Sequence, residues 1–252
     1  MLGIQSSTGI GMSAEGLPEA PSETQPLPPP YERRFSCVER LFGVLFSPSA
    51  AMRDVALAPD YVGAIVIIVL RIVVTGVSLV LAFQKVSFVG GGPFMGLLWS
   101  VVYFGLGVGM VMFFVFWLLK SVLVKVLGDS GSGWEFGVAA SVTGYAYMAS
   151  LVVAVVSLPI VYWFTPSVTI DFSDLEAAQR VLADFQVQVA RVSLFVAAPL
   201  TFLGELWKAY LGSLGTRFGT QLRCSALKGF AIFLLLGLIG WLVGNIQSAA
   251  LV

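Results

Sequence analysis

Five long apolar runs dominate the chain, separated by shorter polar connections. They cover residues 61–83, 94–119, 136–164, 192–211 and 227–247. Each run has about the ~20 residues that an α-helix needs to cross the hydrocarbon core of a bilayer. The pattern predicts an all-α integral membrane protein in which residues 61–252 form a bundle of five transmembrane helices.

Residues 31–60, before the first run, show the periodicity of amphipathic helices. Apolar residues recur at helical spacing on one side and charged residues occupy the other: Phe35, Val38, Leu41, Phe42 and Leu45 against Arg33, Arg34, Glu39 and Arg40. A second short helix is expected to begin after Ser47, with Pro48 at its first position, and to end at Pro59. Such helices lie in the membrane interface or form a lid over the membrane helices, and the sequence leaves both open.

The first 30 residues contain six of the twelve prolines and no Lys or Arg. A secretory signal peptide would begin with basic residues followed by an apolar run. This composition instead predicts a disordered, proline-rich cytoplasmic tail.

Two connections have distinct character. Residues 86–93 contain three consecutive glycines and are expected to form a flexible turn. In residues 165–191, Ser173 and Glu176 have capping-box spacing and begin an amphipathic helix that leads into the fourth span. Its acidic residues are better explained as a solvated face than as a cation site: Asp171, Asp174, Glu176 and Asp184.

Composition excludes several classes of function. Charged residues are 11% of the chain, the formal net charge is zero and there is no histidine. His-based metal sites, Ser-His-Asp hydrolysis and nucleic-acid binding by a basic surface are therefore not expected. No aspartate lies inside an apolar run, which also argues against an aspartyl intramembrane protease. We expect no cofactor, no metal and no enzymatic activity.

The distribution of basic residues predicts the orientation. Ten Lys and Arg residues fall on the side of the N-terminus and three on the opposite side. Because basic residues are enriched in cytoplasmic loops, the N-terminus is expected in the cytoplasm and the C-terminus, after five spans, outside.

Charges within the spans form the first candidate site. Arg71 lies near the middle of the first span, where an arginine costs ~2.5–3.5 kcal/mol on insertion scales. Glu205 lies at a similar expected depth in the fourth span, so the two could form an ion pair, although Lys208 competes for Glu205 at an i, i+3 spacing. The pair would either fix helix register or form a polar site.

Small residues and prolines indicate helix contacts and bends. Glycines at or near four-residue spacing predict close helix packing, within the bundle or between two copies: Gly105, Gly109, Gly144, Gly240 and Gly244. Pro159 and Pro199 are expected to kink the third and fourth spans.

Three sets of short motifs resemble the prokaryotic branch of the Yip1-domain family. They are Leu45-Phe46-Ser47-Pro48-Ser49-Ala50-Ala51-Met52-Arg53-Asp54 with Ala58-Pro59-Asp60; Val126-Leu127-Gly128 with Thr143-Gly144-Tyr145-Ala146; and Glu205-Leu206-Trp207 with Phe218-Gly219-Thr220-Gln221-Leu222-Arg223 and Ala226. The resemblance covers about residues 40–250 and implies a non-enzymatic integral membrane protein, which in a prokaryote would lie in the cell membrane. Eukaryotic relatives bind small GTPases in vesicle traffic, but this chain lacks their Asp-Leu-Tyr-Gly-Pro type motif.

Two functions follow from these observations. The first is a scaffold or adaptor in membrane organisation or traffic, in contact with lipids and with a cytoplasmic or membrane protein or a second copy. Its interaction surface would comprise Phe35, Arg40, Pro48, Arg53, Pro59, Arg217 and Arg223. The second is a small transporter, channel or lipid-handling protein that uses Arg71 and Glu205.

Overall fold

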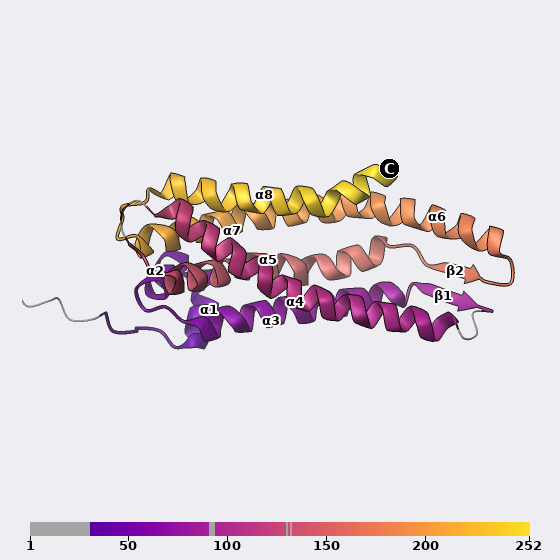
Figure 1. The fold of residues 1–252 in the computed structure, drawn as a ribbon, viewed down its shortest axis with the longest axis horizontal. Coiled ribbons are helices and arrows are strands. Elements are labelled where there is room, and N and C mark those ends of the chain that lie inside the picture. Colours follow the sequence, from indigo (N-terminus) through magenta and orange to yellow (C-terminus); the bar gives the residue numbers. More distant parts are fainter. Residues whose placement is uncertain (1–30, 91–93, 130, 132) are drawn as a thin grey trace, which may run out of the picture. The chain divides into compact units, whose positions relative to one another are not determined.

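The computed structural model describes residues 31–90, 94–129, 131 and 133–252; the predicted tail, residues 1–30, lies outside this part. Helices account for most of it (Figure 1). The elements are α1 (Cys37–Phe46), α2 (Pro48–Leu57), α3 (Tyr61–Phe83), β1 (Val86–Val89), α4 (Phe94–Gly128), α5 (Phe136–Phe164), β2 (Val168–Asp171), α6 (Leu175–Val192), the π-helix η1 (Ser193–Ala197), α7 (Ala198–Gly219) and α8 (Ala226–Leu251).

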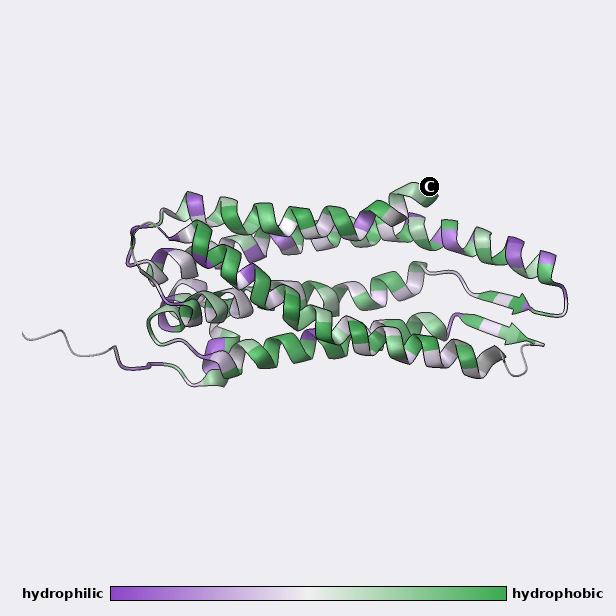
Figure 2. Ribbon diagram, viewed as in Figure 1, coloured by the Kyte–Doolittle hydropathy of each residue, from purple (hydrophilic) through white to green (hydrophobic). Residues whose placement is uncertain are grey.

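Among the described residues, five helical segments are long and apolar enough to cross a membrane, which confirms the predicted all-α multi-pass class. α3 and α5 have the predicted bounds, whereas α4 continues to Gly128. With 35 residues, α4 is about 50 Å long and exceeds the ~30 Å hydrocarbon core. Hydrophobic residues cover the long helices, and hydrophilic ones concentrate near their ends and along α6 (Figure 2).

The fourth span continues directly from the amphipathic helix before it, because α6, η1 and α7 follow one another without a break. η1 ends two residues before Pro199, which has no N–H to donate and would clash with the carbonyl one turn earlier in a regular α-helix. The predicted disturbance at Pro199 therefore coincides with a π-helical turn. α5, by contrast, runs through Pro159 to Phe164.

The start of α6 differs from the prediction. α6 is capped by Asp174 and not by Ser173: the Asp174 side chain accepts a hydrogen bond from the Ala177 N–H at 3.0 Å. The capping box occurs instead at α1, where Ser36 and Glu39 satisfy each other's backbone N–H groups. The hydrogen bond from the Ser36 N–H holds the pKa of the Glu39 carboxyl below its usual value.

The connection after α3 is not simply a turn. β1 pairs in parallel with β2, with Val86 opposite Val168 and Val89 opposite Asp171. Side-chain burial alternates along both strands, and Val86, Val89, Val168 and Ile170 are β-branched, which suits half-buried strands. The sheet ties the α3–α4 connection to the α5–α6 connection. We call this the β1/β2 end of the bundle, and the opposite one the α1/α2 end.

α5 is the central helix, in contact with α3, α4 and α7, while α7 also packs on α8 and α2. Small residues let these backbones approach, as expected for helices in a membrane. A Cβ at Gly144 would overlap the Cβ of Ala64 in α3, so Gly144 packs within the bundle. Gly63 likewise lies directly beneath the Tyr145 side chain of α5.

The Gly63 contact yields a stability test. A Cβ at position 63 would overlap the Tyr145 hydroxyl, so Gly63→Ala should destabilise the protein by about 1–3 kcal/mol. Gly76→Ala is the matched control on the same helix, because nothing lies within 4 Å of its added Cβ. Thermal unfolding in detergent should show a lower Tm for the first variant alone, and equal Tm values would contradict this packing.

Candidate functional site

The first polar cluster lies at the α1/α2 end and inverts the predicted orientation of α1. Arg40 was expected on an exposed basic side, but it is fully buried (0% exposed), as is Val44 one turn later. Val38, Phe42 and Phe46 on the opposite side are 59%, 58% and 80% exposed. Arg40 is thus part of the interior and not of an interaction surface, because the carboxylates that it pairs with are also buried.

Asp54 of α2 is the main partner of Arg40. The Arg40 Nε donates to Asp54 Oδ2 at 2.7 Å, and a second guanidinium nitrogen donates to the Asp54 carbonyl at 3.2 Å. Asp54 Oδ1 accepts from the backbone N–H of Arg34 at 3.0 Å. These charge-assisted hydrogen bonds compensate two charges that would be costly to bury separately.

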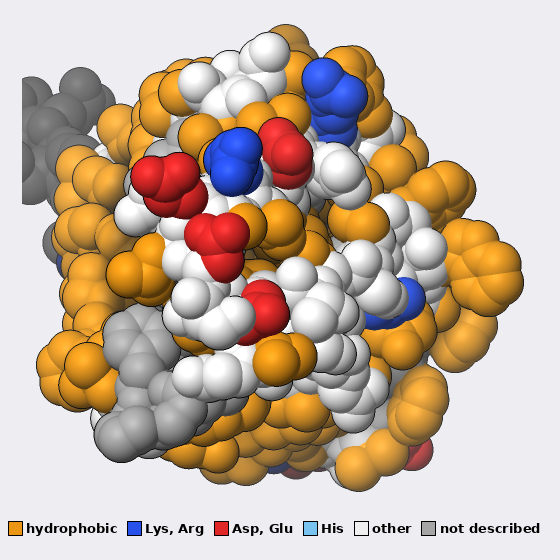
Figure 3. Space-filling model, turned by 90° about the vertical axis from the view of Figure 1, so that its right-hand side faces the viewer, with side chains coloured by type: hydrophobic (Ala, Val, Ile, Leu, Met, Phe, Trp, Pro, Cys, Tyr) orange, Lys and Arg blue, Asp and Glu red, His pale blue; other side chains and the backbone are white. Residues whose placement is uncertain are grey.

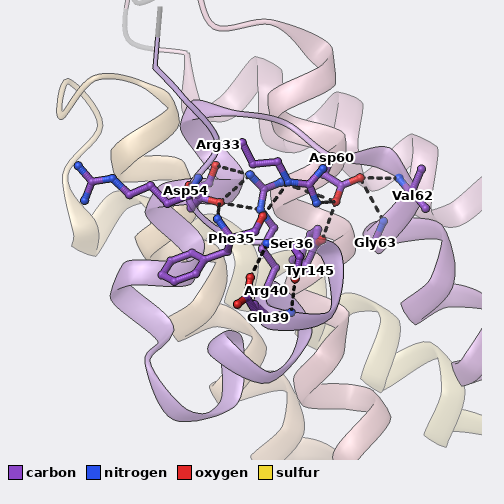
Figure 4. A network of polar contacts seen from close by, with 11 residues as sticks. Arg33, Phe35, Ser36, Glu39, Arg40, Asp54, Asp60, Val62, Gly63 and Tyr145 are labelled. Carbon is purple, nitrogen blue, oxygen red and sulfur yellow. Dashed lines mark hydrogen bonds and ion pairs between the residues drawn. The ribbon is translucent and has the colours of Figure 1, made fainter.

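Asp60 connects the same cluster to the spans (Figure 4). Its Oδ1 caps α3 by accepting from the N–H groups of Val62 and Gly63, at 3.0 and 3.4 Å. Its Oδ2 accepts from Arg33 at 3.1 Å and from the Tyr145 hydroxyl of α5 at 3.2 Å. Arg40 lies 3.6 Å from the same oxygen. We call Arg33, Arg40, Asp54, Asp60 and Tyr145 the Arg40 network.

The Arg40 network was not predicted from the sequence. An aspartate directly before a helix, such as Asp60, is a common N-cap, and nothing in the spacing of Asp54 and Asp60 indicated that both face one arginine. The Ser-x-x-Glu signal at Ser36 and Glu39 was available and would have placed the start of α1 correctly.

The other residues of the predicted interaction surface are accessible. Phe35 and Pro48 are half-buried, whereas Arg53, Pro59 and Arg217 are exposed. Arg223 is exposed and donates a hydrogen bond to the Gly131 carbonyl, which links the α7–α8 turn to the α4–α5 connection.

α1 and α2 also enclose a hollow of about 370 Å³ beside the exposed side of α1. Phe35, Val38, Phe42 and Ala50 contribute apolar surface to it. The three exposed α1 residues, Val38, Phe42 and Phe46, are spaced four apart and form a single line, which we call the α1 stripe.

The second polar cluster lies among the spans. Glu205 forms an ion pair with Lys208, and not with Arg71. Arg71 instead donates to the Thr75 hydroxyl at 3.1 Å, one turn along α3. Lys208 pairs with Glu205 in place of Arg71 because it lies on the same helix, at an i, i+3 spacing that brings the two side chains together. The second carboxylate oxygen of Glu205 is buried without a hydrogen-bond partner and lies against Gly237 of α8.

Two further members of this cluster, Lys120 and Tyr147, were not predicted from the sequence. The Nζ atoms of Lys208 and Lys120 lie 4.9 and 5.8 Å from the ring centroid of Tyr147, within reach of cation–π attraction. Lys120 was counted as an end-of-helix residue, but α4 continues to Gly128. The Lys120 side chain leans toward the N-terminus of α4 and hence toward the middle of the span. We call Arg71, Lys120, Tyr147, Glu205 and Lys208 the Glu205 cluster.

Two cavities meet at Glu205. The first, about 320 Å³, is lined by α3, α5 and α7 and includes both Arg71 and Glu205. The second, about 260 Å³, lies between α7 and α8 and includes Gly240 and Gly244. Arg71 and Glu205 therefore share a cavity although they are not ion-paired.

Four of the five predicted packing glycines do not pack within the bundle. Nothing lies within 4 Å of a Cβ built at Gly105, Gly109, Gly240 or Gly244. Gly105 and Gly109 line a cavity of about 370 Å³ between α3 and α4. The spacing of small residues identifies a smooth helix face, but only the tilt of its neighbour decides whether that face is covered.

The β1/β2 end carries the acidic residues of the α5–α6 connection (Figure 3). Asp171, Asp174, Glu176 and Asp184 are all exposed. Within the described ranges, no three Asp, Glu, Cys or His residues come together in a way that could hold a metal ion.

A comparison with known protein families shows to which family this chain belongs. Residues 42–244 match the Yip1 domain. The protein belongs to the Yip1-domain family. No curated protein and no solved structure matches the chain.

The limits of the Yip1 domain divide the Arg40 network. Asp54, Asp60 and Tyr145 lie inside the matched residues, whereas Arg33 and Arg40 precede residue 42. The cationic half of the network is thus contributed by chain outside the matched domain. All members of the Glu205 cluster lie inside it.

The Arg40 network predicts a large effect of a single substitution. Arg40→Met removes the buried guanidinium that pairs with Asp54 and should destabilise the protein by about 3–5 kcal/mol. Arg53→Met, at an exposed position of α2, should change stability by less than about 0.5 kcal/mol. Adding Asp54→Asn to Arg40→Met should recover part of the loss in Tm. Equal Tm values for Arg40→Met and wild type would refute the network.

Gly237 tests the placement of Glu205. A Cβ at position 237 would overlap the free Glu205 carboxylate oxygen, so Gly237→Ala should lower stability by about 1–3 kcal/mol. Gly240→Ala, three residues along the same helix with open space around it, should be neutral or slightly stabilising. Glu205→Ala should remove the penalty of Gly237→Ala in the double variant. Additive losses would contradict the contact.

Proposed function

We propose that this Yip1-family protein is a non-enzymatic membrane scaffold or adaptor that recruits a protein partner through its α1/α2 end. The observation that carries the proposal is the α1 stripe, three large apolar side chains exposed on a helix whose opposite side is locked into the bundle. A stripe at four-residue spacing is the kind of surface that packs against an apolar groove or helix of another protein.

The Arg40 network supports the proposal by keeping α1 in place. Arg40 and Val44 are buried on one side of the helix, so its orientation is determined and the stripe is displayed without a folding cost on binding. The neighbouring hollow between α1 and α2 offers room for a side chain from a partner. The absence of histidine from the sequence agrees with a role without acid–base chemistry.

The excess of basic residues supports an orientation with this end in the cytoplasm. Among these residues, Arg53 and Arg217 are exposed at the same end. A cytoplasmic partner with acidic residues around an apolar contact would suit this combination.

The test is in-membrane crosslinking at native expression level, followed by mass spectrometry. Phe42→Ser should abolish the crosslink to a discrete protein, because it removes the middle of the stripe. Leu227→Ser is the matched control: Leu227 is also a large apolar residue, 77% exposed and outside α1. A protein crosslink that persists in Phe42→Ser, or crosslinks to lipid alone in the wild type, would contradict the adaptor function.

A second candidate function, a small transporter or lipid-handling protein, also has a specific observation in its favour. Arg71 and Glu205 line one cavity within the spans, where charges are costly and are usually kept for function. The two functions are compatible, since they use opposite halves of the protein.

A further inference from the structure

The cavity that holds Arg71 and Glu205 is a groove along α5. Ser150 and Ser157 of α5 lie in its floor, and α3 and α7 form its walls. Within the described residues, both walls pack on α5 but make no extensive contact with each other. Thr75 and Ser78 on the α3 wall are exposed. The groove is therefore open sideways, between two helices whose outer surfaces face lipid.

The groove has hydroxyl groups along its length and positive charge at both ends. Besides the two serines of the floor, Thr75, Ser78, Tyr162 and Thr201 place hydroxyls on it. Arg71 lies at one end, and Lys85 lies 4.1 Å from the ring centroid of Tyr162 at the other. Fourteen residues separate the two basic residues, or about 20 Å along a helix.

Charge around the inner end of the groove is unbalanced. Arg71, Lys120 and Lys208 are three cations, and Glu205 is the single acidic residue in α3, α4, α5, α7 and α8. Because Glu205 is already paired with Lys208, the Arg71 guanidinium is left with the Thr75 hydroxyl. A guanidinium in a site that faces lipid is stabilised most by an anion that can accept two of its N–H groups.

We propose that this groove binds the phosphate headgroup of an anionic phospholipid, with Arg71 as the phosphate-binding residue. The headgroup would lie against the hydroxyl-lined walls, and the acyl chains would leave through the open side into the bilayer. A soluble anion has the same phosphate chemistry but makes no use of that opening. The inference rests on the second candidate function and gives it a ligand class.

The test uses the full-length protein in detergent and measures Tm with added dioleoyl phosphatidylglycerol or with the same amount of dioleoylglycerol. At a lipid concentration ten times Kd, phosphatidylglycerol should raise the Tm by roughly 3–5 °C. Dioleoylglycerol, which has no phosphate, should not raise the Tm.

Arg71→Gln should abolish the Tm shift with phosphatidylglycerol, whereas Arg53→Gln, which removes one charge from an exposed position, should retain it. Ser78→Phe, which narrows the groove without changing charge, should also abolish the shift and serves if Arg71→Gln does not fold.

Several results would overturn the proposal. The first is a Tm shift with phosphatidylglycerol that persists in both Arg71→Gln and Ser78→Phe. The second is a loss of that shift that is equal in Arg71→Gln and Arg53→Gln. The third is a rise in Tm with dioleoylglycerol equal to that with phosphatidylglycerol. Stabilisation by glycerol phosphate equal to that by the lipid would assign the site to a soluble anion and overturn the lipid. Transfer of lipid between vesicle leaflets is measured separately: binding without transfer removes the transport function and leaves the ligand class standing.

Discussion

The structure depends on one carboxylate, that of Asp60, at the point where the first span begins. It caps α3 through two backbone N–H groups and, on its other oxygen, accepts hydrogen bonds from Arg33 and the Tyr145 hydroxyl. A cap is a local requirement of any helix, but here the same side chain joins the chain before α1 to the first and third spans. With Arg40 and Asp54, it makes a network of two cations and two anions whose charges balance. α1 is consequently held with an apolar side outward.

The balance at the α1/α2 end contrasts with the imbalance inside the spans. Arg71, Lys120 and Lys208 face a single carboxylate, and that carboxylate has one oxygen without a hydrogen-bond partner. Such charges raise the free energy of inserting a helix into the membrane, and a neutral residue would insert more easily. Their position beside an open, hydroxyl-lined groove is the basis of the proposed ligand site.

Glycine has three different uses in this fold. Gly63 and Gly144 allow α3 and α5 to approach, and Gly237 makes room for the Glu205 carboxylate. Gly105 and Gly240 meet nothing and line cavities. Tight packing around α5 and open space beside α4 and α8 together indicate a rigid centre with accessible flanks, an arrangement that suits binding at the surface of the bundle.

The sequence alone determined the five spans, the Yip1 resemblance and the two helices before the first span. These properties follow from hydrophobic length and from periodicity, which are local and additive along the chain. The bounds of α3 and α5 were predicted to the residue for this reason, because each is a long apolar run between strong stop signals.

Tertiary structure decided which side of α1 is buried, which cation pairs with Glu205, which glycines are covered and that β1 pairs with β2. An amphipathic pattern has two sides, and only the position of Asp54 and Asp60 made the charged one the interior. Arg71 and Glu205 line one cavity, in keeping with the similar depth expected from the sequence, but depth does not specify rotation about the helix axis. Rotation and tilt depend on contacts between residues far apart in the chain, so they are properties of the packed bundle rather than of any one segment.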